Sequence, residues 1–312
     1  MTSIEWTRAD DGSEGKVWNP TTGCDRVSAG CDHCYAMTMA KRLKGMGQPK
    51  YQNDGCPRTS GPGFGLTVHP DTLMIPLYWR EPRRIFVNSM SDLFHAEVPK
   101  EFIAKMFAVM AACPQHTFQV LTKRHARMRS LLNSHGFWML VVAECLDLTD
   151  LPIPGVLFDT HQLPNVWLGV SAEDQHWADI RIPALLNTPA AVRFVSAEPL
   201  LGPIDLTWCS GVNALHPDWA GGPSGGTGSP HPLLDWVIAG GESGRGARPC
   251  DLAWIRLLID CCEGSSAAVF VKQLGSVLGR EVGAGSKGGD WDHWPEDLRV
   301  REFPHTAEGV PV

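Results

Sequence analysis

Short apolar runs recur along the chain, and most of them are followed by a polar cluster and then by a stretch with helical periodicity. Because both alternating faces of each run are mostly apolar, we interpret the runs as strands buried in a parallel sheet. They lie at residues 84–87, 117–121, 165–170, 192–195, 236–239 and 268–271, and residues 17–22 are a candidate for a further, first strand.

Helices are predicted between these runs. Residues 99–112 carry apolar side chains from Phe102 to Met110 at helical spacing, and Asp251 is a candidate N-cap for a helix whose apolar stripe starts at Leu252. The other helical segments are 36–44, 125–133 and 177–187, the last with Pro183 as a candidate interruption. Strands that alternate with helices form βαβ units. The pattern therefore predicts an α/β protein with a partial or full (β/α) barrel of parallel strands, and an open doubly wound sheet is the alternative.

The predicted barrel accounts for most of the chain. We expect residues 1–282 to form the barrel and catalytic domain. Two stretches rich in Gly, Pro and polar residues, at about 45–70 and 210–232, are predicted to be surface loop insertions. Residues 283–312 are expected to be a C-terminal tail that packs on or near the barrel.

Composition restricts the class of protein. The chain has 312 residues, of which 43% are hydrophobic and 20% charged, with a net charge of −7. No apolar run is long enough to cross a bilayer and no signal peptide is recognisable, so a cytoplasmic protein is expected. The negative balance argues against binding nucleic acid mainly through its phosphates. Residues 123–129 are locally basic and could hold a phosphate, although the solvated face of a helix explains them equally well.

Polar side chains follow every predicted strand, at the end of a parallel barrel where functional residues gather. They are Asn88, Ser89 and Asp92 after 84–87, Lys123 and Arg124 after 117–121, Ser171 and Glu173 after 165–170, Glu198 after 192–195, Glu242 after 236–239, and Lys272 after 268–271. Glu242 follows the pair Gly240 and Gly241, which would let a ligand approach the backbone closely. Loops after strands are often polar for solubility alone. Together, however, these residues predict a polar pocket.

Three of the ten cysteines form the most informative motif in the chain. Cys24, Cys31 and Cys34 are spaced C-x6-C-x2-C on one loop, and three thiolates suit a cubane iron–sulfur cluster with one iron left open. A structural zinc site that adds His33 is the alternative for a metal, and a loop without metal is a third interpretation. Of the remaining cysteines, four are expected to be small buried residues, namely Cys113, Cys145, Cys261 and Cys262.

Several motifs resemble one family in order along nearly the whole chain. They are IEWT at 4–7, WNP at 18–20 with the cysteine loop, FVNSMSDLFH at 86–95, LTKR at 121–124, WLGVSAE at 167–173, FVSAEPLLGP at 194–203, AGGESG at 239–244, VKQ at 271–273 and LRVR at 298–301. With these motifs the chain resembles the phage Gp37/Gp68 family, also called DUF5131. The three-cysteine loop after the first strand also resembles the radical S-adenosylmethionine (SAM) superfamily, whose common spacing is C-x3-C-x2-C.

The resemblance implies a barrel of the radical SAM type and a [4Fe-4S] cluster on Cys24, Cys31 and Cys34. SAM would bind the open iron and be cleaved to a 5′-deoxyadenosyl radical, which abstracts hydrogen from a substrate. By strand count, Asn88, Ser89 and Asp92 occupy the place where the superfamily holds the SAM amino group. By the same count, Ser171 and Glu173 could reach the ribose or the methionine end.

A radical SAM enzyme is therefore the main hypothesis, with Lys123, Glu198, Glu242 and Lys272 as catalytic candidates that line the substrate side together with Arg124. A phage-type family suggests a nucleobase, nucleotide or nucleic acid as substrate, a flavodoxin or ferredoxin as electron donor, and a possible partner protein. Two alternatives stay open. One is a zinc-stabilised phage binding protein without enzymatic activity, and the other is a metal-free (β/α) hydrolase or nuclease that uses Asp92, Glu198 and Glu242.

Overall fold

Seven strands pair in one parallel sheet in the computed structural model, which describes residues 4–8, 14–148, 161–216 and 232–304. The strands are β1 (Lys16–Trp18), β4 (Arg84–Val87), β5 (Thr117–Thr122), β6 (Val166–Ser171), β7 (Val192–Ala197), β8 (Trp236–Gly240) and β9 (Ala268–Gln273), in the order β1-β4-β5-β6-β7-β8-β9. This order and direction are those of a partial (β/α) barrel, which confirms the predicted fold class. A separate antiparallel pair consists of β2 (Thr21–Thr22) and β3 (Thr67–Val68).

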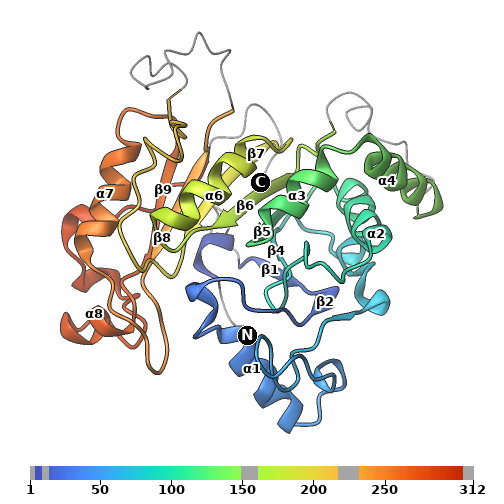
Figure 1. Cartoon of the computed structure of the whole chain (residues 1–312), viewed down its shortest axis with the longest axis horizontal. Coiled ribbons are helices and arrows are strands. Elements are labelled where there is room, and N and C mark those ends of the chain that lie inside the picture. The colour runs from blue at the N-terminus through green and yellow to red at the C-terminus, as the bar shows by residue number, and fades with distance from the viewer. Residues whose placement is uncertain (1–3, 9–13, 149–160, 217–231, 305–312) are drawn as a thin grey trace. The chain divides into compact units, whose positions relative to one another are not determined.

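The helices alternate with the strands, as the periodicity predicts (Figure 1). They are α1 (Tyr35–Gly45), α2 (Lys100–Ala111), α3 (His125–Leu132), α4 (His135–Leu148), α6 (Gln175–Leu186), α7 (Leu252–Cys262) and α8 (Ser276–Glu281). The predicted interruption at Pro183 is wrong, because α6 continues for three residues beyond it. A proline removes only its own amide donor, and the Asn187 N–H still donates to the Pro183 carbonyl at 3.1 Å.

The chain divides into two compact units. Among the described residues, unit 1 comprises the chain up to residue 168 together with 188–191, and unit 2 comprises 169–187 and the chain from 192 onward. The division predicted at residue 282 stays a prediction. Of the two predicted insertions, 45–70 contains β3 and a short 3-10 helix, Pro49–Tyr51, whereas residues 217–231 of the other lie outside the described part of the chain.

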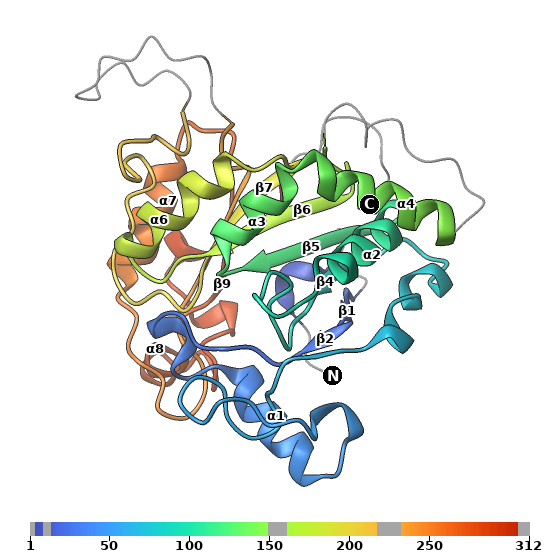
Figure 2. The same cartoon turned by 45° about the vertical axis from the view of Figure 1, so that its right-hand side comes forward.

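In unit 1, two helices pack against each other beside the sheet. α2 and α4 run side by side in both views (Figure 1, Figure 2). The Phe107 ring on α2 meets Phe137 and Trp138 on α4 edge-on, with both pairs of ring centroids 5.7 Å apart. This is a favourable geometry for aromatic pairs. α4 has no counterpart among the predicted helices, because its apolar run from Phe137 to Val142 lacks a clear helical period.

In unit 2, α7 packs on β8 and β9, and the C-terminal segment covers the edge of β9. The N–H of Val271 donates to the Val300 carbonyl at 2.8 Å, and the N–H of Glu302 donates to the Val269 carbonyl at 2.8 Å. The guanidinium of Arg301 lies between 4.9 and 5.4 Å from the centroids of three aromatic rings, those of Phe270, Trp291 and Trp294. Covering an edge strand in this way prevents it from pairing with another chain.

The N-cap of α7 provides a test of the local fold. The Asp251 carboxylate accepts a hydrogen bond from the Ala253 N–H at 2.8 Å. Asp251→Ala removes this cap, and we expect the free energy of unfolding to fall by about 1 kcal/mol in urea titrations. Asp260→Ala, at an exposed position in the last turn of the same helix, should change it by less than about 0.5 kcal/mol. Equal losses in the two variants would show that the cap contributes nothing specific.

Candidate functional site

The three motif cysteines lie on one loop of unit 1, between β2 and α1. Cys31 is the last residue of a 3-10 turn, Ala29–Cys31, and Cys34 directly precedes α1. Gly23 begins the loop with φ +88°, and its N–H donates to the Met90 carbonyl at 2.9 Å. A Cβ at this position would lie 2.3 Å from the Gly65 carbonyl oxygen, so only glycine fits. The loop is thereby tied to the segment that follows β4.

All three thiols are half-buried. Cys24 and Cys34 pack against an apolar cluster formed by Ala36, Ala40, Phe64 and Met90. Burial raises the pKa of Cys24 to about 12 and also raises that of Cys34, and the neighbouring Cys31 raises both further. Cys24 and Cys34 are therefore neutral thiols near pH 7, and a metal that binds them must displace their protons.

The arrangement of the thiols bears on which metal group they could hold. Within the described residues, no group of three or more His, Cys, Asp or Glu side chains gathers closely enough around one point to bind a single ion. His33, the fourth residue of the zinc hypothesis, is exposed. A cubane cluster binds each thiolate through a different iron, so it requires three sulfurs around a shared space rather than around one point. The chemistry of the three thiols fits such a cluster.

Two cations from the end of β5 adjoin the thiols. Burial and the Asp92 charge raise the pKa of Cys24, and the Arg124 guanidinium lowers it by smaller amounts through its charge and hydrogen bonding. The Lys123 charge lowers the pKa of Cys34. Arg124 Nη2 donates to the Asp25 carbonyl at 3.1 Å. Its Nε–H is buried and has no hydrogen-bond partner within the described chain. A buried donor without an acceptor is costly, so this atom favours an anionic group beside Cys24.

The Asp92 carboxylate connects the ends of β4 and β5. One oxygen accepts from the Thr122 hydroxyl at 2.7 Å and from the Phe94 N–H at 3.0 Å, and the other accepts from the Lys123 N–H at 2.9 Å. Asp92 is 7% exposed. Sequence reasoning placed Asp92 at a cofactor, but its hydrogen bonds go to the protein, where they hold the segment that carries Lys123 and Arg124.

A pair formed by the half-buried Asp25 carboxylate and the buried His95 imidazole lies beside the first cysteine and was not predicted as a site. Asp25 Oδ2 is 2.9 Å from His95 Nε2, and Asp25 Oδ1 accepts from the Thr59 hydroxyl at 2.5 Å. Burial alone would raise the pKa of Asp25, but these two hydrogen bonds outweigh it and lower the pKa overall. The direct succession of Asp25 after Cys24 was the only sequence signal for this contact.

Two predicted cofactor residues follow β4 and lie near the end of β1. Asn88 is 4% exposed and has φ +60°, in the left-handed region that is strained for most residues. Its Oδ1 accepts from the Thr21 N–H at 3.4 Å, whereas its buried Nδ2 has no partner in the described parts of the chain. The Ser89 hydroxyl is 3.3 Å from the Asn19 side chain, and the Ser89 carbonyl accepts from the Tyr35 hydroxyl at 2.5 Å.

Ser89 also lines a cavity of about 350 Å³ in unit 1. Asn19 and Tyr35 contribute polar groups to its wall, and Met39 and Met90 contribute apolar ones. Its volume lies at the lower end of the range of small-molecule sites. Since Tyr35 immediately follows Cys34, the cavity adjoins the cysteine loop.

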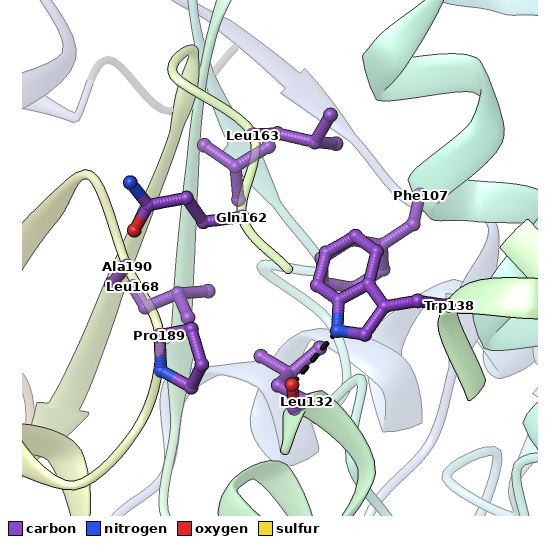
Figure 3. A pocket seen from close by; sticks show the side chains of 9 residues that line it. Phe107, Leu132, Trp138, Gln162, Leu163, Leu168, Pro189 and Ala190 are labelled. Carbon is purple, nitrogen blue, oxygen red and sulfur yellow. Dashed lines mark hydrogen bonds between the residues drawn. The ribbon is translucent and has the colours of Figure 1, made fainter. Parts of the chain in front are cut away.

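A different cavity in unit 1 is a packing void rather than a site (Figure 3). It measures about 10 Å³ and is lined mostly by apolar side chains, with the Trp138 indole N–H donating to the Leu132 carbonyl at 2.8 Å. Such a volume holds at most about one water molecule.

In unit 2, two predicted SAM residues are engaged by one buried arginine. Glu173 and Arg181 are both 0% exposed, and Arg181 Nη1 lies 3.1 Å from Glu173 Oε2 and 2.9 Å from the Ser171 carbonyl. The Arg181 guanidinium stacks 4.0 Å from the Trp177 ring centroid. The structure thus brings Ser171 and Glu173 together through an ion pair that fixes α6 to the end of β6.

The ends of β7, β8 and β9 carry the other catalytic candidates. Lys272 Nζ lies 3.1 Å from Glu198 Oε1, and both side chains remain partly open to solvent. A Cβ on Gly240 would lie 2.6 Å from the same Glu198 oxygen, so glycine makes room for the carboxylate. Glu242 differs, because the Arg248 side chain binds both of its oxygens, at 2.6 and 2.9 Å. Glu198 and Lys272 therefore form an accessible pair, whereas Glu242 anchors its own loop.

These features define an α/β protein with a partial parallel barrel and a three-cysteine loop. A family model described as protein of unknown function (DUF5131) matches residues 1–296, and the chain belongs to this family. No curated protein and no solved structure matches the chain. Among the described residues, no helix has the length and apolar character needed to span a membrane.

The rates at which the cysteines are alkylated test how strongly each thiol is buried. Hydrogen bonds of the exposed Cys56 thiol with the backbone of Arg58 and with the hydroxyl and backbone of Thr59 lower its pKa. Burial instead raises the pKa of Cys24 and of Cys34. Because the thiolate is the reactive form, iodoacetamide at pH 7.5 should alkylate Cys56 of the metal-free protein well before Cys24 and Cys34, as followed by peptide mass spectrometry. In urea the difference should vanish. Equal rates in the native protein would contradict the burial of the two loop thiols.

Proposed function

We propose that this protein is a radical SAM enzyme whose [4Fe-4S] cluster is held by Cys24, Cys31 and Cys34. The observation that carries the proposal is the environment of the three thiols. They share one loop beside an apolar cluster, and the buried Arg124 Nε–H beside them lacks an acceptor in the described chain. A negatively charged cluster would supply that acceptor.

When bound, the cluster and SAM supply a reductively generated 5′-deoxyadenosyl radical for hydrogen abstraction. The residues of the chain would bind, orient and protect these groups. Asn88 is suited to hold SAM, because its buried Nδ2 has no hydrogen-bond partner among the described residues. The cavity lined by Ser89 and Tyr35 offers room for part of a nucleoside-sized ligand.

We assign residues to substrate binding from the chemistry of their side chains, not from their positions relative to the cysteine loop. Glu198 and Lys272 form an ion pair that is open enough to exchange protons with a ligand, and Lys123 is a further cation in unit 1. We infer a nucleobase, a nucleotide or a nucleic acid as the substrate, with a flavodoxin or ferredoxin as the electron donor. A partner protein that presents the substrate is compatible with this proposal.

Single substitutions of the cysteines test the proposal. We expect Cys24→Ala, Cys31→Ala and Cys34→Ala each to lose the iron–sulfur cluster and the reductive cleavage of SAM, measured as 5′-deoxyadenosine formed with dithionite under anaerobic conditions. Each removes one of the three ligands. Cys56→Ala is the matched control, because Cys56 is exposed and lies outside the motif, and it should retain cleavage. Cleavage that survives loss of all three motif cysteines would refute the radical mechanism.

A pair of variants at Asn88 separates ligand binding from folding. Asn88→Gly and Asn88→Ala both remove the amide, but only glycine adopts φ +60° without strain. We expect both to weaken SAM binding to the reconstituted protein about tenfold, the effect of losing one hydrogen bond of about 1.4 kcal/mol. Both variants also lose the hydrogen bond from the Thr21 N–H, and the strain at φ +60° should make Asn88→Ala less stable than Asn88→Gly by roughly 1 kcal/mol. Unchanged SAM binding in equilibrium dialysis of Asn88→Gly would remove Asn88 from the site.

A further inference from the structure

We propose that Arg124 is a positioning residue that raises the reduction potential of the cluster by directing its guanidinium at the Cys24 sulfur. This inference rests on the proposed function, since it requires a cluster on the three cysteines. It concerns a residue that the motif does not contain, about a hundred positions along the chain from Cys24.

Arg124 is held in place at its backbone and at the end of its side chain. Its backbone N–H donates to the Thr122 hydroxyl at 2.8 Å, and that hydroxyl in turn donates to the buried Asp92 carboxylate at 2.7 Å. Its Nη2 donates to the Asp25 carbonyl at 3.1 Å, directly beside Cys24. These bonds fix both ends of the residue, so the side chain has little freedom to turn away from the loop.

One donor of the Arg124 guanidinium group is buried without a partner in the described chain. The bond to the Asp25 carbonyl places the Arg124 guanidinium beside the Cys24 segment, and its buried Nε–H has no acceptor in the described part of the protein. A cluster sulfur or a ligating thiolate beside Cys24 would accept from it. The apolar cluster on which Cys24 packs keeps the local dielectric low, which strengthens such a contact.

The effect on the potential has a definite sign. Reduction adds one negative charge to the cluster, and a cation that donates to its sulfur stabilises the reduced form more than the oxidised form. A hydrogen bond that involves a charged group is roughly twice as strong as one between neutral groups. Lys123 also lowers the pKa of its neighbouring thiol, Cys34, but through its charge alone, so its effect on the potential should be smaller.

The test is a redox titration of the full-length, reconstituted protein without SAM, followed by electron paramagnetic resonance. Arg124→Met keeps the aliphatic stem but removes the charge and the donors. We expect its reduction equilibrium constant to fall by about tenfold or more relative to wild type, which is at least about 59 mV for a one-electron couple. Arg124→Lys, which keeps the charge, should fall in between, and Lys123→Met should shift less than Arg124→Met.

Arg129→Met is the matched control, because it removes the same group from an exposed position of α3. It should leave the potential unchanged. Equal potentials in wild type, Arg124→Met and Arg124→Lys would overturn the inference while leaving the cluster in place. If Arg124→Met takes up no cluster, the comparison of Arg124→Lys with wild type decides, since a fall supports the inference and no change overturns it. A wild-type protein that takes up no iron would overturn the proposed function and this inference with it.

Discussion

The candidate site depends on the hydrogen bonds of the buried Asp92 carboxylate. This group follows β4 and binds the Thr122 hydroxyl and the Lys123 N–H at the end of β5, so it sets the distance between two neighbouring strand ends. The Gly23 N–H binds the Met90 carbonyl in the same post-β4 segment. The cysteine loop and the cationic segment are therefore both fixed to the loop that follows β4. Without these bonds, nothing in the local sequence would bring Arg124 to Cys24.

The electrostatics of this region balance two opposing effects. Burial on the apolar cluster keeps Cys24 and Cys34 protonated in the absence of a metal, while Arg124 and Lys123 favour the thiolates. The neutral thiols of the empty loop need no counterion, whereas the buried Arg124 Nε–H has no acceptor there in the described chain. Once the protons are displaced, the two cations compensate the negative charge that remains. The environment therefore favours the loaded loop.

Much of the fold could be predicted from the sequence, since the buried parallel strands are continuous apolar runs bounded by polar clusters. The run at 192–195 became β7, Val192–Ala197, and Asp251 caps α7 as its position suggested. The helix α4 was not predicted, because its apolar side chains are contiguous and show no helical period. Periodicity also could not decide whether Pro183 ends its helix, because a single lost hydrogen bond near the last turn is tolerated.

The candidate site was predictable in its residue types but not in its partners. Strand ends directed attention to Asp92, Glu173 and Glu242, and in the structure the carboxylates of all three bind protein groups. A carboxylate that anchors a loop and one that binds a ligand look the same in sequence. The difference lies in contacts such as Glu173 with Arg181, which depend on how a helix packs on its strand. The contact of Arg124 with the Asp25 carbonyl, next to Cys24, likewise depends on the pairing of β4 with β5.

The most direct test of the central claim is the metal content of anaerobically purified protein, combined with low-temperature electron paramagnetic resonance of the reduced protein with and without SAM. The account predicts about four irons and four sulfides per chain and a resonance that changes when SAM is added, because one iron is left open to it. One zinc per chain with no iron and no effect of SAM would contradict it and would identify the cysteine loop as a structural metal site.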